Sequence, residues 1–120
     1  MTAAAQRYTI DSERIVAVGY SNGANIAASV LLLHPGIFSA AILFRAMVPL
    51  IPETQPDLSS ARIWIGAGRF DPIIPVSQTE RLAQLLRTAG ADVTIRFFRA
   101  GHELTSEDID AGHEWLMALP

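Results

Sequence analysis

The stretch VAVGYSNGANIAAS, from Val16 to Ser29, decides the fold of this chain. Its first part continues an apolar, β-rich run over residues 15–18, which is typical of a strand that is covered on both faces. Its second part opens a segment, Asn22 to Leu33, that is apolar nearly all round, as expected of a deeply buried helix. The pattern predicts a strand, a sharp turn at Ser21 and a helix.

The rest of the chain alternates in the same way. Three further strands are expected, at residues 40–44, 63–66 and 93–98, with helices between and after them. Strands that alternate with helices form βαβ units around a parallel sheet. We therefore expect an α/β fold in which a parallel sheet is flanked by helices in three αβα layers.

Helix boundaries are also marked in the sequence. Ser77 and Glu80 have the spacing of a capping box, and Gly90 stands where that helix would stop. Thr105, followed by acidic residues, can open a last helix. In that helix we expect three side chains to face inward: Ile109, Leu116 and Leu119. Near the start of the chain, Ala3 to Tyr8 is interpreted as the tail of a helix.

Composition limits the classes of protein. The 120 residues fit one domain, and 50% of them are hydrophobic, which is enough to bury a core. A net charge of −3 with scattered basic residues argues against nucleic-acid binding. Disulfides and thiolate metal sites are excluded because there is no cysteine, and that composition suits the cytoplasm. The apolar stretch 26–44 is interrupted by His34-Pro35-Gly36, so no membrane span is expected.

The turn carries the motif Gly-x-Ser-x-Gly, as Gly19-Tyr20-Ser21-Asn22-Gly23. A strand-to-helix turn of this kind strains the serine backbone and exposes its hydroxyl. Larger side chains at either glycine would clash with the neighbouring strand or helix. The backbone N–H of Asn22 would point at the oxyanion of a transition state. The alternative is an ordinary tight turn with a small residue.

A nucleophilic serine needs a base, and the chain has three histidines. His102 follows the fourth predicted strand, so it lies at the same sheet edge as Ser21, where ligand sites of such sheets gather. His34 is expected to cap a helix or face water, and His113 to be solvated or packed. The alternative for His102 is an ordinary loop histidine.

The base in turn needs an acid to orient it. Asp71, in Gly68-Arg69-Phe70-Asp71-Pro72, follows the third strand at the same edge. Asp57 and Asp92 are interpreted as solvated turn residues. An ordinary Asp-Pro turn is the alternative for Asp71, but the order Ser, Asp, His along the chain belongs to α/β-hydrolases.

Four blocks in this order, GYSNGANIAAS, LFRAMVPL, GAGRFDPIIP and AGHELT, resemble the phospholipase/carboxylesterase family of α/β-hydrolases, bacterial carboxylesterases included. The resemblance implies Ser21 as nucleophile, His102 as general base and then acid, and Asp71 as its orienting residue. It implies hydrolysis of a small-molecule ester through an acyl-enzyme, with no metal or organic cofactor.

By the same resemblance, the region after the second strand would line the acyl or alcohol pocket: Phe44, Arg45, Met47, Val48 and Leu50. Ordinary core packing at a strand end is the alternative for these residues. Arg45 would either meet an acidic leaving group or pair with a carboxylate on the surface.

The sequence departs from the family in lacking its front half, which carries several strands and a His-Gly loop with a second oxyanion donor. Residues 1–120 are therefore expected to form a single α/β-hydrolase domain that is truncated at its N-terminus. The first strand would have a bare edge, where a complementing chain or a second copy could pair. The alternative function is a non-catalytic half-domain that needs another polypeptide.

Overall fold

The structure, a computed structural model, describes residues 15–119. Its elements follow in the order β1 (Val16–Tyr20), α1 (Asn22–Leu33), β2 (Ala40–Phe44), β3 (Arg62–Gly68), α2 (Val76–Thr88), β4 (Asp92–Phe98) and α3 (Ser106–Met117). The predicted alternation of strands and helices is confirmed, with strand ends that differ by one or two residues from those expected. The helical tail expected at Ala3 to Tyr8 lies outside the described residues.

The four strands form one parallel sheet in the order β1-β2-β3-β4. Tyr20 is in register with Phe44, which is in register with Gly66 on β3. The carboxyl ends of neighbouring strands therefore lie side by side. The residues that follow each strand, Ser21 and Arg45 among them, meet at this one edge of the sheet.

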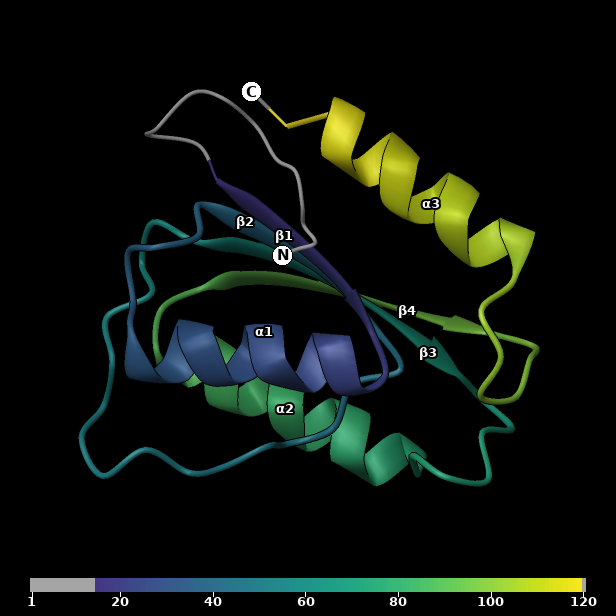
Figure 1. Cartoon of the computed structure of the whole chain (residues 1–120), viewed down its shortest axis with the longest axis horizontal. Coiled ribbons are helices and arrows are strands. Elements are labelled where there is room, and N and C mark those ends of the chain that lie inside the picture. Colours follow the sequence, from purple (N-terminus) through teal and green to yellow (C-terminus); the bar gives the residue numbers. More distant parts are fainter. Residues whose placement is uncertain (1–14, 120) are drawn as a thin grey trace.

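Helices cover both faces of the sheet, so the fold has the expected three layers (Figure 1). On one face α1 and α2 pack against the strands around a large core that includes Leu31, Ile63 and Leu82. On the other face α3 packs over a smaller, aromatic core of Ile42, Phe44, Trp64 and Phe98. The predicted α/β class, a parallel sheet between helices, is confirmed.

The first helix is less buried than its composition predicted. Ala24, Ala28 and Leu31 are buried, but Ile26 is 66% exposed and Leu33 is 52% exposed. The expectation that α1 is deeply buried is therefore wrong for its outer face. Within residues 15–119, α1 packs mainly on β1 and β2, and β1 is the edge strand on that side, so the outer face of α1 is left uncovered.

The capping box predicted at Ser77 is absent, whereas Thr105, expected only to open the last helix, forms one. The Thr105 hydroxyl accepts a hydrogen bond from the Asp108 N–H, and the Asp108 carboxylate accepts one from the Thr105 N–H. In contrast, α2 already begins at Val76 after Pro75, so Ser77 lies inside the first turn and caps nothing. Gly90, with a φ of +103°, follows the end of α2 as expected.

The inward face of α3 differs from the predicted one. Leu116 packs on the aromatic core as expected, but Ile109 is 52% exposed. The residues of α3 that are buried are Asp108 and Gly112. Asp108 turns inward because it has a charged partner, and Gly112 lets the helix approach β2: a Cβ there would come within 3.2 Å of the Phe44 ring.

In the described part of the chain, β1 is an edge strand, as predicted from the sequence. Val18 on this strand is 54% exposed and Tyr20 is 39% exposed. Across residues 15–119, every helix is too short or too polar to cross a membrane.

Candidate active site

Ser21 occupies the turn between β1 and α1 with φ 57° and ψ −114°, angles that a non-glycine residue rarely adopts. Its N–H donates to the Phe44 carbonyl at 2.8 Å, and its carbonyl accepts from the Asn25 N–H at 3.0 Å. These two bonds hold the serine between the end of β2 and the first turn of α1. The strained turn expected from the motif is present.

The two glycines of the motif have different surroundings. A Cβ at Gly19 would lie 2.6 Å from backbone atoms of Gly23 and Ala24, so only glycine fits there without a shift of the helix. A Cβ at Gly23 would meet nothing within 4 Å. The predicted clash is therefore confirmed for Gly19 and wrong for Gly23, because Gly23 lies on the exposed side of the turn.

Three side chains that are far apart in the sequence meet at this edge. The Ser21 hydroxyl lies 3.0 Å from Nε2 of His102. Nδ1 of the same imidazole lies 2.8 Å from the Asp71 carboxylate. An imidazole in this position can take the hydroxyl proton through one nitrogen while the other is held by the carboxylate.

Backbone hydrogen bonds hold the Asp71 carboxylate in place beside the imidazole of His102. The second oxygen of Asp71 accepts hydrogen bonds from the N–H groups of Ile73 and Ile74, at 2.8 and 2.9 Å. Burial raises the pKa of Asp71, but these backbone bonds and His102 outweigh it and hold the pKa below its usual value. The Asp71 side chain is fully buried, whereas 19% of the His102 side chain is exposed. The site thus has a charged, enclosed end and an accessible end.

Backbone contacts bring the two loops together. The N–H groups of Arg69 and Phe70 donate to the carbonyls of Phe98 and Ala100, at 2.9 and 3.0 Å. A side chain at Gly68 would collide with the Gly101 carbonyl. The loop that carries Asp71 and the loop that carries His102 therefore lie against each other where β3 and β4 end.

Asn22 is the first residue of α1. N–H groups in the first turn of a helix have no partner within the helix, and they lie at its positive end. The position of Asn22 directly after Ser21 suits a backbone donor to a substrate oxygen.

The residues expected to line a pocket separate into different groups. Phe44 does line a cavity of about 410 Å³ on the α3 side of the sheet, together with Tyr20, Leu104 and Leu116. Val48 and Leu50 pack against the large core, as the alternative of ordinary core packing predicted. The Met47 N–H donates to the side chain of Asn25.

Arg45 does not line that cavity, and its partner is buried rather than on the surface. Its side chain is buried and makes an ion pair with the equally buried Asp108, with 2.8 Å between the charged atoms. Sequence reasoning missed this pair because the two residues are 63 positions apart and Asp108 carries only the signal of a capping residue.

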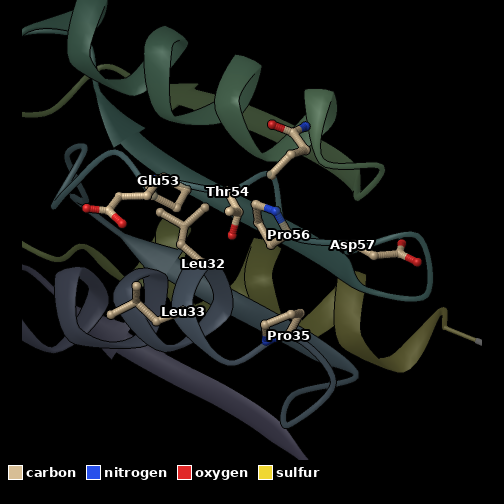
Figure 2. Close-up of a pocket in the computed structure, with 9 residues that line it drawn as sticks. Leu32, Leu33, Pro35, Glu53, Thr54, Pro56 and Asp57 are labelled. Carbon is tan, nitrogen blue, oxygen red and sulfur yellow. The ribbon is translucent and has the colours of Figure 1, made fainter.

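A second cavity, of about 550 Å³, lies elsewhere (Figure 2). Leu32 and Leu33 from the last turn of α1 face Glu53 and Pro56 of the loop between β2 and β3. Ser21 lies at the opposite end of α1, so this cavity is separate from the candidate site.

Within residues 15–119, the other titratable candidates make no hydrogen bond to the three side chains, although His113 lines the cavity beside Tyr20. His34 ends α1 and is exposed, and His113 is an exposed residue of α3. Asp57 accepts a hydrogen bond from the Ser59 N–H in an exposed turn, and Asp92 is exposed at the start of β4. The surface roles expected for these residues fit their positions.

The family is shown by comparison. The model of the dienelactone hydrolase family matches residues 1–114. The chain belongs to this family. A Bacillus subtilis (strain 168) relative named "Putative hydrolase MhqD" is 38% identical over 112 residues, which are 93% of this chain and 56% of the relative.

Solved structures agree with this assignment. A Bacillus cereus carboxylesterase superposes with a TM-score of 0.84 at 39% identity, over 92% of this chain and 52% of the other. A carboxylesterase from Mesorhizobium loti gives 0.81 at 36% identity, over 87% of this chain and 49% of the other. The chain is thus a hydrolase by family, and it spans about half the length of the relatives that it matches.

Proposed function

We propose that the protein hydrolyses carboxylic esters through an acyl-enzyme formed on Ser21. The observation that carries this proposal is the continuous chain of two short contacts, Ser21 to His102 at 3.0 Å and His102 to Asp71 at 2.8 Å. A hydroxyl, an imidazole and a carboxylate in bonding order are the parts of a serine hydrolase triad. The strained backbone of Ser21 supports the same role.

The proposed reaction has two halves. His102 accepts the Ser21 proton as the hydroxyl oxygen attacks the ester carbonyl, and then gives that proton to the departing alcohol. A water molecule next attacks the acyl-enzyme, with His102 again taking and returning the proton, and the acid is released. Asp71 remains ionised, keeps the imidazole in the correct tautomer and stabilises its protonated form. The backbone N–H of Asn22 donates to the oxyanion.

We propose a small-molecule ester as the substrate, because relatives of solved structure are carboxylesterases. The strand that leads to Ser21 also borders an apolar cavity, lined by Tyr20, Phe44 and Leu104 among others. The proposed steps use side chains, a backbone N–H and water, and they call for no metal or organic cofactor.

A fluorophosphonate probe tests the proposal. We expect it to label the protein at one serine, and Ser21→Ala to abolish the labelling. Ser29→Ala is a matched control, because Ser29 lies within α1, away from the turn, and its hydroxyl donates to the Asn25 carbonyl. Absence of labelling in folded protein, or labelling that survives Ser21→Ala, would contradict the proposal.

A second candidate is favoured by the edge position of β1 in the described part of the sheet. The chain would then be one part of a single α/β-hydrolase domain, inactive until a complementing polypeptide or a second copy covers that edge. The exposed apolar residues of β1 and α1 support it, as does the span of about half of each relative. Loss of one oxyanion donor typically costs about 2.7–4 kcal/mol of transition-state stabilisation, so a missing partner would lower activity strongly.

A further inference from the structure

Arg45 is an unusual residue for the place where it lies. It follows β2 directly and has a φ of 57°, so its backbone is in the left-handed region that disfavours a long side chain. Its guanidinium is nevertheless buried and points across the end of the sheet toward α3. Both terminal nitrogens donate to the Asp108 carboxylate, each at 2.8 Å.

The remaining donors of Arg45 reach the loop that carries His102. Its Nε donates to the Gly101 carbonyl at 3.0 Å, and one terminal nitrogen also donates to the Glu103 carbonyl at 2.9 Å. These are the carbonyls directly before and after His102. The carbonyl of His102 itself accepts from the Tyr20 hydroxyl at 3.0 Å. Three consecutive carbonyls are thus held by side chains from the ends of β1 and β2.

We propose that Arg45 is a positioning residue, which fixes the backbone on both sides of His102 so that the imidazole reaches Ser21 and Asp71 together. This inference rests on the proposed triad. It concerns the hydrogen bonds that Arg45 donates to the backbone on either side of His102, which are separate from the contacts among the three triad side chains.

The chemistry of arginine suits this task. The guanidinium is a rigid planar group with five N–H donors. Here the edge formed by its two terminal nitrogens binds a carboxylate, while further donors bind two backbone carbonyls. Lysine has a single ammonium on a flexible stem and cannot reproduce that geometry. A buried ion pair is weak evidence for stability, because burying the two charges offsets their attraction. More precise positioning of the loop that carries His102 explains the buried ion pair better than a gain in stability does.

Asp108, the ion-pair partner of Arg45, is also held in place. Asp108 lies in the first turn of α3, where the Thr105 hydroxyl donates to its carboxylate. Burial raises the pKa of Asp108, but the bonds from Arg45 and Thr105 outweigh it and hold the pKa below its usual value. Asp108 is therefore charged at neutral pH, and Arg45 joins the sheet edge, the His102 loop and α3 into one unit.

Arg45→Lys tests the proposal, with 4-nitrophenyl acetate as the ester. We expect kcat, corrected for the folded fraction, to fall by about 10²-fold with KM nearly unchanged, as for a small misplacement of a catalytic group. Arg87→Lys is the control: Arg87 also donates to a backbone carbonyl, that of Val93, away from the site. A kcat within twofold of wild type for folded Arg45→Lys would overturn the proposal, as would a change in KM alone.

A second readout separates this inference from the proposed function. In wild type, the proton between Nδ1 of His102 and Asp71 is expected as a downfield NMR signal, which Arg45→Lys should broaden or shift and Arg87→Lys should not. An unchanged signal in Arg45→Lys would refute positioning even if the protein had no esterase activity. If Arg45→Lys does not fold, Asp108→Asn, which leaves Arg45 one carboxamide oxygen, is measured in the same way and must show a smaller change of the same kind.

Discussion

At the scale of single residues, two residues of the candidate site have a strained backbone conformation. In residues 15–119, Ser21 and Arg45 are the non-glycine residues with positive φ. Such a conformation costs about 1–3 kcal/mol and persists only where the surroundings fix it. Ser21 is fixed by backbone bonds to Phe44 and Asn25, and Arg45 by a backbone bond to Gly66 and by its buried ion pair. Both strained residues begin the segments that follow a strand, at the edge where His102 and Asp71 meet.

The two glycines around Ser21 give a prediction at this scale. Gly19→Ala should lower the free energy of unfolding by about 1–3 kcal/mol, because its methyl group would overlap the backbone at Gly23 and Ala24. Gly23→Ala is the matched change: it has open space, and alanine favours the helix, so stability should be unchanged or higher. Urea unfolding measures both. Equal losses in the two variants would show that the turn does not have this asymmetry.

At the scale of elements, the two helix starts show how a cap depends on the chain before it. Both Ser77 and Thr105 stand ahead of an acidic residue at the right spacing. Only Thr105 has the extended backbone of a cap, with φ −105° and ψ 164°. At α2, Pro75 has the extended conformation instead, and the helix has begun by the time Ser77 is reached. Spacing alone does not distinguish a capping residue from a residue of the first turn.

Thr105→Ala tests the cap of α3. We expect a loss of about 1 kcal/mol in the free energy of unfolding, because the Asp108 N–H loses its acceptor and the Asp108 carboxylate loses a donor. For a domain of this size that corresponds to a melting point lower by roughly 4 °C.

Ser77→Ala is the control for this change. Its exposed side chain lies in the first turn of α2, which has no side-chain cap bond. The free energy of unfolding should therefore change by no more than about 0.5 kcal/mol, as for other surface substitutions. A melting point of Thr105→Ala equal to that of Ser77→Ala would mean that the capping box adds nothing to stability.

At the scale of the whole molecule, the sheet is unequally covered. The central strands are buried between helices on both faces, whereas β1 at the edge exposes Val18 and the neighbouring helix exposes Ile26. An edge strand with unpaired N–H and carbonyl groups and apolar side chains favours pairing with another chain. This asymmetry is the physical basis of the second candidate function.

We expect the protein to self-associate at micromolar concentrations, in a way that sedimentation velocity can follow. The double variant Val18→Lys/Ile26→Lys should remain monomeric, because two charges at the edge oppose strand pairing. Ile73→Lys removes an equally exposed isoleucine, 63% against 66% for Ile26, from the loop after β3, and it should associate like wild type. A wild-type protein that stays monomeric at every concentration would contradict this prediction.

Much of the fold could be predicted from the sequence, because its signals are local. The apolar run before Gly19, the apolar segment after Ser21 and Pro35 at its end are sufficient for β1 and α1. The same holds for the alternation along the rest of the chain. Parallel strands separated by helices also bring the residues after each strand to one edge, so the meeting of Ser21, Asp71 and His102 could be expected before their distances were known.

What only the tertiary structure decided depends on contacts between residues that are distant in the sequence. From the sequence, Arg45 is predicted to be a pocket residue, but in the structure it pairs with Asp108 of α3. Likewise α1 is predicted to be buried, but its outer face is uncovered beside the edge strand β1. Local periodicity reports that a side chain is apolar or that a turn is sharp. It does not report which other element packs against that side chain. For a buried charge such as Arg45, or an exposed isoleucine such as Ile26, the packing partner decides the free energy of placing the side chain there.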